Sequence, residues 1–182
     1  MMRELSMHIL DIVENSVRAG SPTVKVDVME DTRTNMLSFA IADKGKGMST
    51  EMAARLSDPF VTTRDTRKVG LGIPLLAQTC FQCGGALHID SVPGEGTTVT
   101  ATVRADHIDC PPLGDIAQTM HVLIMMRPEI DILYTHRYND AAYTLDTVEI
   151  KAALEGVPLT EPAVIQWLKA EIEGGLADIR GR

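Results

Sequence analysis

The sequence predicts an α+β fold, in which helices alternate with antiparallel strand pairs along the chain. A helical repeat of apolar residues covers 5–19, and the segments 23–28 and 36–42 alternate as the two strands of a hairpin do. A second strand pair is expected at 86–92 and 97–103, after another helical segment. Because 45% of the 182 residues are hydrophobic, the chain has enough apolar surface to bury a core.

The composition limits the partners and the compartment that are expected. A net charge of −8 argues against a broad, nonspecific nucleic-acid surface. No apolar run approaches the roughly eighteen residues of a membrane span, and the first residues lack the apolar stretch of a signal peptide. We therefore expect no nucleic-acid or membrane partner and a cytoplasmic location, which the odd number of cysteines, three, also favours.

The first predicted helix, 5–19, has an apolar face and a narrow polar face. Gly20 and Pro22 follow it, at positions where a helix commonly ends. Asparagine is a poor helix former, but its amide oxygen can ligate a hard cation, and an aspartate one turn earlier can hold a water molecule. The polar face carries His8, Asp11, Asn15 and Arg18. This face is therefore either a solvated helix surface or part of a cation site.

A short segment after the predicted strand 36–42 has the composition of a ligand site. A carboxylate ends the strand and two glycines follow it, one residue apart, in the run Asp43-Lys44-Gly45-Lys46-Gly47-Met48. The glycines allow positive φ and let a ligand approach the backbone. The carboxylate is an anionic acceptor that suits an exocyclic amine better than a phosphate, which it would repel. A short helix to about residue 56 follows, with Ser49 or Thr50 as its N-cap.

The pattern changes in the segment 57–68, where Pro59-Phe60-Val61 forms a small apolar anchor and 62–68 is polar and basic without periodicity. A loop of this kind is either a solvated loop without a function or a segment suited to closure over an anionic ligand. It leads into Gly70-Leu71-Gly72, which opens a helix that has Pro74 in its first turn. Free backbone N–H groups at the start of a helix, together with the helix dipole, favour phosphate binding.

A second, smaller α+β unit is expected at 106–182. It is too apolar to stand bare, so we expect it to pack on the first unit or to form a dimer or partner surface. Its predicted elements are a helix at 113–126, a hairpin at 130–136 and 141–145, and helices at 146–154 and 161–179.

Two cysteine patterns lie outside these motifs. Cys80 and Cys83 stand three residues apart near the end of a predicted helix, and Cys110 follows the fourth strand with His107 close by in sequence. We expect the first pair to pack in the core. A metal site formed with the residues around Cys110 stays open as the alternative.

Residues 1–105 resemble the GHKL ATP-binding domain shared by histidine kinases, anti-sigma-factor serine kinases, gyrase B and the mismatch-repair protein MutL. Each motif alone is common, but four in the family's order and spacing are specific. The resemblance implies the GHKL (Bergerat) fold, a two-layer α/β sandwich whose mixed sheet has its helices on one face, with 106–182 as a C-terminal extension. The matching motifs are Glu14-Asn15-Ser16-Val17-Arg18-Ala19-Gly20 (N box), Asp43-x-Gly45-x-Gly47-Met48 (G1 box), Asp58-Pro59-Phe60 (F box) and Gly70-Leu71-Gly72 (G2 box).

The resemblance also implies ATP and Mg²⁺ as ligands and gives roles to single residues. Asn15 would hold the Mg²⁺ that bridges the phosphates, and Asp43 would accept a hydrogen bond from the adenine amine. Gly45 and Gly47 would let the base lie close to the backbone, with Met48 packed beside it. The further nucleotide contacts that it implies are Arg18, Phe60, Thr62, Thr63, Arg64, Lys68, Gly70, Leu71, Gly72 and Thr97.

Asp11 lies where GHKL ATPases and anti-sigma kinases usually have a glutamate that polarises the attacking water or hydroxyl. Aspartate is one methylene shorter than glutamate, and it lies on the same helix face as Asn15. Two roles stay open for this residue: the general base of the reaction, or a carboxylate that holds a water bound to the metal ion.

The resemblance implies two alternative functions. Only four residues precede the first helix, so the helical hairpin that carries the phosphoacceptor of histidine kinases is not expected in this chain. The first function is therefore that of a Mg-ATP-binding, histidine-kinase-like protein that phosphorylates a separate partner protein or regulates it in an ATP-dependent way. A homodimer is left open. The alternative is a GHKL ATPase that is not a kinase and works as an ATP-driven conformational switch.

Overall fold

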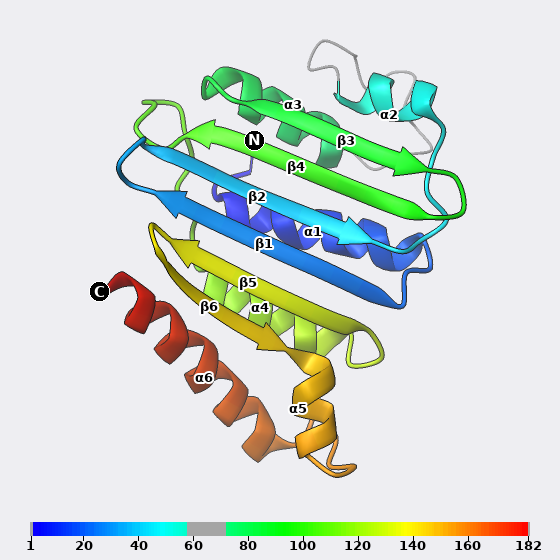
Figure 1. Ribbon diagram of the computed structural model, residues 1–182, viewed down its shortest axis with the longest axis vertical. Helices are drawn as coiled ribbons and strands as arrows, with labels where there is room; N and C mark the ends of the chain where they lie inside the picture. Colours follow the sequence, from blue (N-terminus) through cyan, green and yellow to red (C-terminus); the bar gives the residue numbers. More distant parts are fainter. Residues whose placement is uncertain (1, 58–71, 182) are drawn as a thin grey trace.

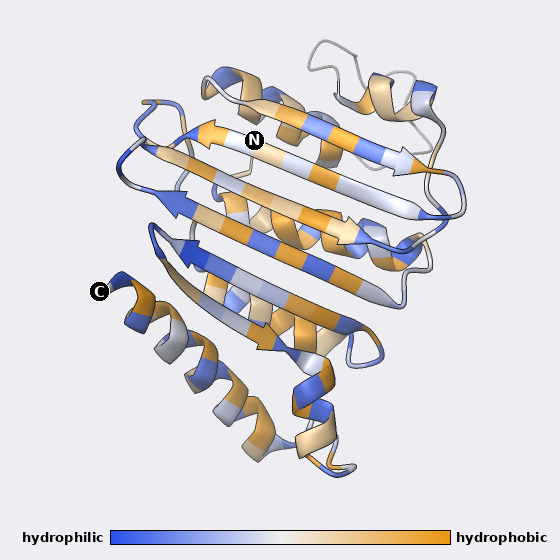
Figure 2. Ribbon diagram, viewed as in Figure 1, coloured by the Kyte–Doolittle hydropathy of each residue, from blue (hydrophilic) through white to orange (hydrophobic). Residues whose placement is uncertain are grey.

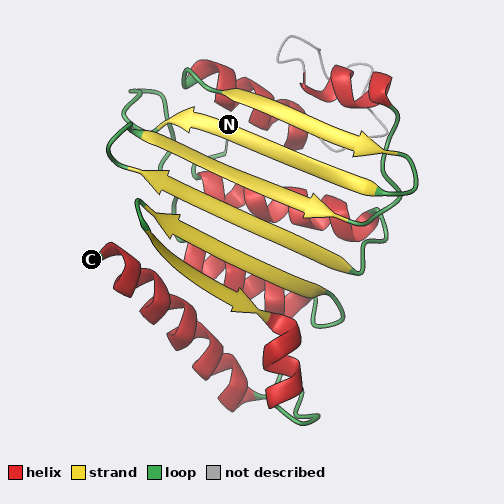
Figure 3. Cartoon of the chain, in the orientation of Figure 1, coloured by secondary structure: helices red, strands yellow, loops and turns green. Residues whose placement is uncertain are grey.

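The structure, a computed structural model, describes residues 2–57 and 72–181. The helices and strands expected within these residues are present (Figures 1 and 3). In the part of the chain that is described, no helix has the length and apolarity needed to cross a membrane. In chain order the elements are α1 (Leu5–Arg18), β1 (Thr23–Asp31), β2 (Met36–Asp43), α2 (Thr50–Ser57), α3 (Gly72–Gln82), β3 (Ala86–Val92), β4 (Gly96–Arg104), α4 (Ile116–Met126), β5 (Asp131–Tyr138), β6 (Ala141–Asp146), α5 (Thr147–Ala153) and α6 (Pro162–Arg180).

The six strands lie in one sheet, in the order β3-β4-β2-β1-β5-β6 (Figure 1). Neighbouring strands are antiparallel except for β1 and β5, which run parallel along the whole of β5, so the sheet is mixed. Strands β5 and β6 come from the segment 106–182 and extend the sheet that the first four strands begin. The division of the chain into units at 1–105 and 106–182 stays a prediction.

Helices cover one face of this sheet. α1, α3 and α4 lie behind the strands in Figure 1, and the hydropathy alternates along several strands in Figure 2. In β1, Val24, Val26 and Val28 are buried, while Lys25, between them, is exposed. This period of two puts the valines on the helix side and the polar residues on the opposite face. The predicted α+β fold, with a mixed sheet and helices on one face, is confirmed.

A Schellman motif ends α1 beside the site. The N–H of Gly20, which has φ +81°, donates to the carbonyl of Val17 at 2.9 Å. The N–H of Ser21 donates to the carbonyl of Ser16 at 3.1 Å. The motif needs a residue with positive φ after the helix, a conformation that glycine adopts without steric cost. The prediction that α1 stops at Gly20 is therefore confirmed, and Gly84 ends α3 with the same pair of bonds.

A polar network that runs from the core to the surface ties α6 to the sheet. At the end of α6, Arg180 donates to Oε1 of Glu30 in β1 at 2.7 Å, and the same oxygen lies 2.9 Å from Nε2 of His136 in β5. The other ring nitrogen of His136 lies 2.7 Å from the hydroxyl of Tyr134. Burial raises the pKa of Glu30, but the hydrogen bonds from His136 and Arg180 outweigh it and hold the pKa below its ordinary value of 4.5. The carboxylate therefore stays ionised at neutral pH.

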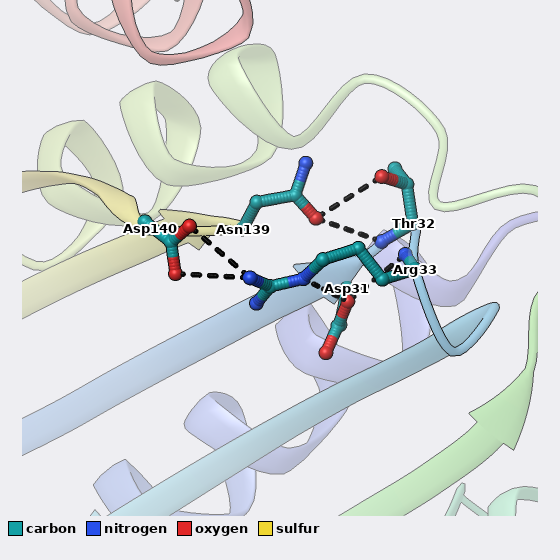
Figure 4. Close-up of polar contacts among 5 residues, drawn as sticks. All are labelled: Asp31, Thr32, Arg33, Asn139 and Asp140. Atoms are coloured by element: carbon teal, nitrogen blue, oxygen red, sulfur yellow. Dashed lines mark hydrogen bonds and ion pairs between the residues drawn. The ribbon is translucent and has the colours of Figure 1, made fainter.

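A second polar cluster joins the β1–β2 turn to the β5–β6 hairpin (Figure 4). Nη1 of Arg33 lies 3.1 and 3.2 Å from the two carboxylate oxygens of Asp140, and Nε donates to Asp31 at 3.2 Å. Oδ1 of Asn139 accepts from the backbone N–H and the hydroxyl of Thr32, at 2.9 and 3.0 Å. This cluster lies at the end of the sheet where β1 ends and β2 begins.

We expect Leu168→Ala to lower the free energy of unfolding by about 2–5 kcal/mol, because this α6 side chain is fully buried and its truncation leaves a cavity. Gln166→Ala, two residues earlier on the exposed side of α6, should change it by less than about 0.5 kcal/mol. Urea denaturation followed by circular dichroism measures both values. Equal midpoints for the two variants would contradict the packing of α6 on the core.

Candidate functional site

A pocket of about 350 Å³ lies at the end of the sheet where β2 stops and β4 starts. Its walls come from the second half of α1, the turn after β2, the first residues of α2 and α3, and β4. The volume is in the range of pockets that hold small molecules. The pocket therefore gathers residues from distant parts of the chain at one sheet end.

Asp43, the last residue of β2, is held by donors from three parts of the chain. Its Oδ2 accepts a hydrogen bond from the hydroxyl of Ser16 in α1 at 2.7 Å. Its Oδ1 accepts from the backbone N–H of Gly45 at 2.8 Å and from that of Thr97 in β4 at 3.2 Å. A carboxylate oxygen accepts about two hydrogen bonds. Oδ1 is therefore filled, whereas Oδ2 accepts one hydrogen bond from the described residues and keeps one acceptor position for a donor in the pocket.

A pair of hydroxyls from β3 and β4 supports the pocket wall. The hydroxyl of Ser91 donates to the carbonyl of Gly96 at 3.0 Å and accepts from the backbone N–H of Met48 at 2.9 Å. Since Ser91 has a single hydroxyl hydrogen, Thr97 donates in the 2.8 Å bond between the two hydroxyls. The backbone of Met48 and the side chain of Thr97 are thus both fixed in place.

Two glycines in the turn after β2 allow close contacts between backbone segments. Gly47 has φ +62°, and a Cβ there would collide with the carbonyl of Val92. A Cβ at Gly45 would lie 2.7 Å from Cβ of Ala19 and 3.1 Å from Oδ1 of Asp43. From the sequence, these glycines were predicted to let a ligand approach the backbone. The structure adds a second reason, because the turn packs directly against β3 and the end of α1.

Asp11 and Asn15 lie one turn apart on α1 and carry unpartnered polar atoms. Oδ2 of Asp11 and Nδ2 of Asn15 are buried and have no hydrogen-bond partner among the described residues. Gly72 begins α3 so close to Asp11 that a Cβ at position 72 would overlap the carboxylate. The carboxylate therefore lies at the N-terminal end of α3, where the helix dipole favours negative charge. Buried polar atoms of this kind are normally satisfied by water, an ion or a ligand.

The other polar residues of α1 differ in their surroundings. His8 is buried, and burial lowers the pKa of its imidazole to about 4, so the ring is neutral at neutral pH. Arg18 lines the pocket, and its Nη1 donates to Oδ1 of Asn15 at 3.3 Å. The polar face predicted for this helix is thus a mixed surface, buried at His8 and open to the pocket at Arg18.

The structure brings together the predicted site residues that it describes. The backbone N–H of Gly45 donates to the carboxylate of Asp43. Asp11 and Gly72 pack on each other, and their neighbours in sequence, Ile12 and Ile73, line the pocket. The predicted residues that line the pocket are Asn15, Arg18, Asp43, Gly47, Met48 and Thr97. The other predicted residues lie outside the described part of the chain, and these are Phe60, Thr62, Thr63, Arg64, Lys68, Gly70 and Leu71.

Several lining residues were not predicted from the sequence. The apolar ones fit the helix and strand periodicity of a core, and periodicity does not distinguish a side chain buried by protein from one that forms a pocket wall. Ser16 carried a usable signal, since it is a hydroxyl residue among the apolar positions of α1. The unpredicted lining residues are Ile12, Ser16, Ala19, Lys46, Met52, Ile73 and Val99.

The cysteines lie apart from this pocket. Cys80 and Cys83 are buried in the core, as expected. Burial raises the pKa of the Cys80 thiol, and that of the Cys110 thiol, to about 12. Thiols with such pKa values are protonated and unreactive at neutral pH. Among the described residues, no group of three His, Cys, Asp or Glu side chains is arranged to hold a metal ion.

Comparison with known proteins matches the region that contains the pocket. The model of the histidine kinase-, DNA gyrase B- and HSP90-like ATPases matches residues 3–107. The chain is 33% identical over 116 residues to the non-motile and phage-resistance protein of Caulobacter vibrioides, covering 59% of this chain and 14% of that protein. It is 35% identical over 92 residues to the sensor protein kinase FleS of Pseudomonas aeruginosa, covering 50% of this chain and 23% of that protein. The matched part is thus less than a quarter of either relative.

A solved structure shares the fold. It is that of the N-terminal domain of a DNA repair protein, with a TM-score of 0.52 and 14% sequence identity. The likeness covers 80% of this chain and 53% of that chain. Since the family model ends at residue 107, the shared fold includes part of the segment that follows.

We expect Gly47→Ala to destabilise the protein more than Gly94→Ala. Both substitutions place a side chain at positive φ, with a cost of about 1–2 kcal/mol. A Cβ at position 94 meets no atom of the described residues within 4 Å, whereas one at position 47 collides with the Val92 carbonyl. The free energies of unfolding, measured by urea denaturation, should therefore differ by a further 1–3 kcal/mol, roughly. Equal losses would show that the turn is not packed as described.

Proposed function

The chain belongs to the family of histidine kinase-, DNA gyrase B- and HSP90-like ATPases, and from this premise we propose that it binds Mg-ATP and phosphorylates, or regulates in an ATP-dependent way, a separate partner protein. One observation carries the nucleotide part of the proposal. The carboxylate of Asp43 is held by three internal donors and keeps one acceptor position toward a pocket of nucleotide size.

The surroundings of Asp43 suit an adenine base. Adenine is flat, has apolar faces and carries an amine on one edge, so it needs apolar walls and an acceptor at the end. Ile12, Met48 and Val99 line the pocket and supply the walls, and Oδ2 of Asp43 supplies the acceptor. A phosphate would be repelled by the same carboxylate. The base, rather than the triphosphate, therefore belongs at Asp43.

The residues of α1 fit Mg²⁺ between the pocket and the start of α3. Asn15 and Asp11 carry oxygen atoms, the donors that this ion prefers, and Oδ2 of Asp11 is buried without a partner among the described residues. The N-terminal end of α3 favours phosphate, but the Asp11 carboxylate lies there too. The chemistry that Mg²⁺ would supply is neutralisation of these neighbouring negative charges. We propose that Asn15 holds the ion and that Asp11 lies close to it.

Among the described residues, Asp11 is the carboxylate of α1 that has no ion-pair partner, so it is the one proposed to act in a transfer step. Glu14 precedes Asn15 directly, but Arg127 binds both of its carboxylate oxygens, at 2.7 and 3.0 Å. Asp11 would take a proton from the attacking group if it is the general base. In its other role it would orient a water molecule beside the phosphates without accepting a proton.

The choice between a kinase and an ATPase concerns what receives the phosphoryl group. The name of one relative, a sensor protein kinase, supports transfer to a protein. The alternative is ATP hydrolysis coupled to a conformational change. It is favoured by the sheet itself, because strands of the segment 106–182 belong to the same sheet as β2 and β4, which line the pocket. The partner, its phosphoacceptor and a homodimer all remain proposals.

We expect Asn15→Ala to abolish Mg-ATP binding in isothermal titration calorimetry, because the variant loses the amide oxygen proposed to hold the ion. Removal of Mg²⁺ with EDTA should also weaken ATP binding to the wild-type protein, as the substitution does. Lys25→Ala, on the uncovered face of the sheet, is the matched control and should bind like the wild type. Unchanged affinity in the Asn15 variant would remove this residue from the proposed metal site.

We expect Asp11→Asn to keep Mg-ATP binding within about threefold and to lower turnover by a factor of roughly 10²–10⁴, the contribution of a general base. Incubation with γ-labelled ATP and a cell lysate measures the turnover. Label on a protein supports the kinase, whereas free phosphate alone supports the ATPase. Full turnover in the Asp11 variant would exclude the general-base role and leave the water-holding one.

A further inference from the structure

The helix that carries Asn15 is held at its start by the segment that follows β4. The backbone N–H of Leu5 donates to the carbonyl of Pro112 at 2.9 Å. The N–H of Ser6 donates to the carbonyl of Leu113, also at 2.9 Å. The first N–H groups of an α-helix have no partner within the helix, so these bonds close the first turn of α1 from outside.

An arginine from the same segment holds α1 near its other end. Arg127 follows α4, and its Nε and Nη2 donate to the two oxygens of Glu14, at 3.0 and 2.7 Å. The side chain of Glu14 is 16% exposed and that of Arg127 is 33% exposed. A two-pronged pair between a guanidinium and a carboxylate fixes direction as well as distance. The hydrogen bonds from Arg127 also hold the pKa of Glu14 below its ordinary value, so the pair is ionised at neutral pH.

Three consecutive residues of α1 face three different partners. Side chains of successive helical residues point about 100° apart around the axis. Glu14 is fixed to Arg127, and Ser16 is fixed to Asp43 of β2 at 2.7 Å. Asn15 lies between them and is bonded to Arg18 of its own helix at 3.3 Å. The bonds of Glu14 and Ser16 fix the rotation of α1 about its axis. This rotation determines the direction in which the side chain of Asn15 points.

We propose that Arg127 is a positioning residue for the pocket: its ion pair with Glu14 sets the rotation of α1 and so aims Asn15 at the metal–nucleotide. The segment 106–182 thereby controls the affinity of the site for Mg-ATP. This inference rests on the proposed function, since it takes Asn15 as the residue that holds the ion.

The Arg33 cluster offers a matched control within the same chain. It also joins the first part of the chain to the segment 106–182 through an arginine and a carboxylate (Figure 4). The Arg33 cluster differs from the Arg127 pair in its position, because Asp31 and Asp140 lie at the far end of the sheet from Asp43. Loss of either arginine removes one tie between the two segments, but only Arg127 contacts α1.

The test measures ATP affinity by calorimetry with Mg²⁺ and again with EDTA, in wild type, Arg127→Ala and Arg33→Ala. We expect Arg127→Ala to weaken Mg-ATP binding about tenfold, with a smaller loss in EDTA, because the aim of Asn15 matters when the ion is present. Arg33→Ala should stay within about twofold of wild type in both conditions. Glu14→Gln should lose as much as Arg127→Ala, and the double variant no more than either, because both changes break one interaction.

The outcomes separate this inference from the proposed function. A wild-type protein that does not bind Mg-ATP would overturn the proposed function and this inference together. Wild-type binding with an unchanged Mg²⁺ dependence in Arg127→Ala would overturn the positioning role alone. An equal loss with Mg²⁺ and with EDTA would also overturn it, since that is a general effect on the pocket. If circular dichroism finds Arg127→Ala unfolded, Arg127→Met takes its place, because it keeps a long side chain without a charge or an N–H donor, and wild-type affinity in that variant overturns the inference.

Discussion

The carboxylate of Asp43 is the point on which the site depends. It accepts hydrogen bonds from Ser16 in α1, from the turn at Gly45 and from Thr97 in β4, so one side chain joins a helix and two strands. Charge-assisted bonds of this kind are about twice as strong as those between neutral groups. They place the carboxylate at the pocket wall with one acceptor position to spare. The rest of the pocket is arranged around a group that is already fixed before any ligand arrives.

The second constraint is that α1 is bonded to two neighbouring parts of the chain. Its face toward the sheet carries Ser16, and its flank toward α4 carries Glu14, so the site helix is packed between β2 and the segment that follows β4. That segment also supplies β5, which pairs in parallel with β1. The family resemblance covers the first part of the chain, but the pocket helix is held by both parts. A change in the packing of α4 therefore acts on α1 directly.

Electrostatics decides how an anionic ligand can be held by an acidic protein. The chain has a net charge of −8, and carboxylates lie at the pocket wall and beside the start of α3. Arg18 and Lys46 are the cationic side chains that line the described part of the pocket. Such a site suits a ligand whose base meets the carboxylate and whose phosphates meet backbone N–H groups and a metal ion.

The sequence by itself determined the elements and the chemical groups of the site. Periodicity located α1 and the strands, and the glycines around Asp43 marked the turn, because these are local properties of a few adjacent residues. Only the tertiary structure decided which groups meet. Ser16 lies 27 residues from Asp43, Thr97 lies 54 residues from it, and Arg127 lies 113 residues from Glu14. Such pairs depend on strand order, register and helix packing, which arise from contacts among all elements at once and leave no local pattern in the chain.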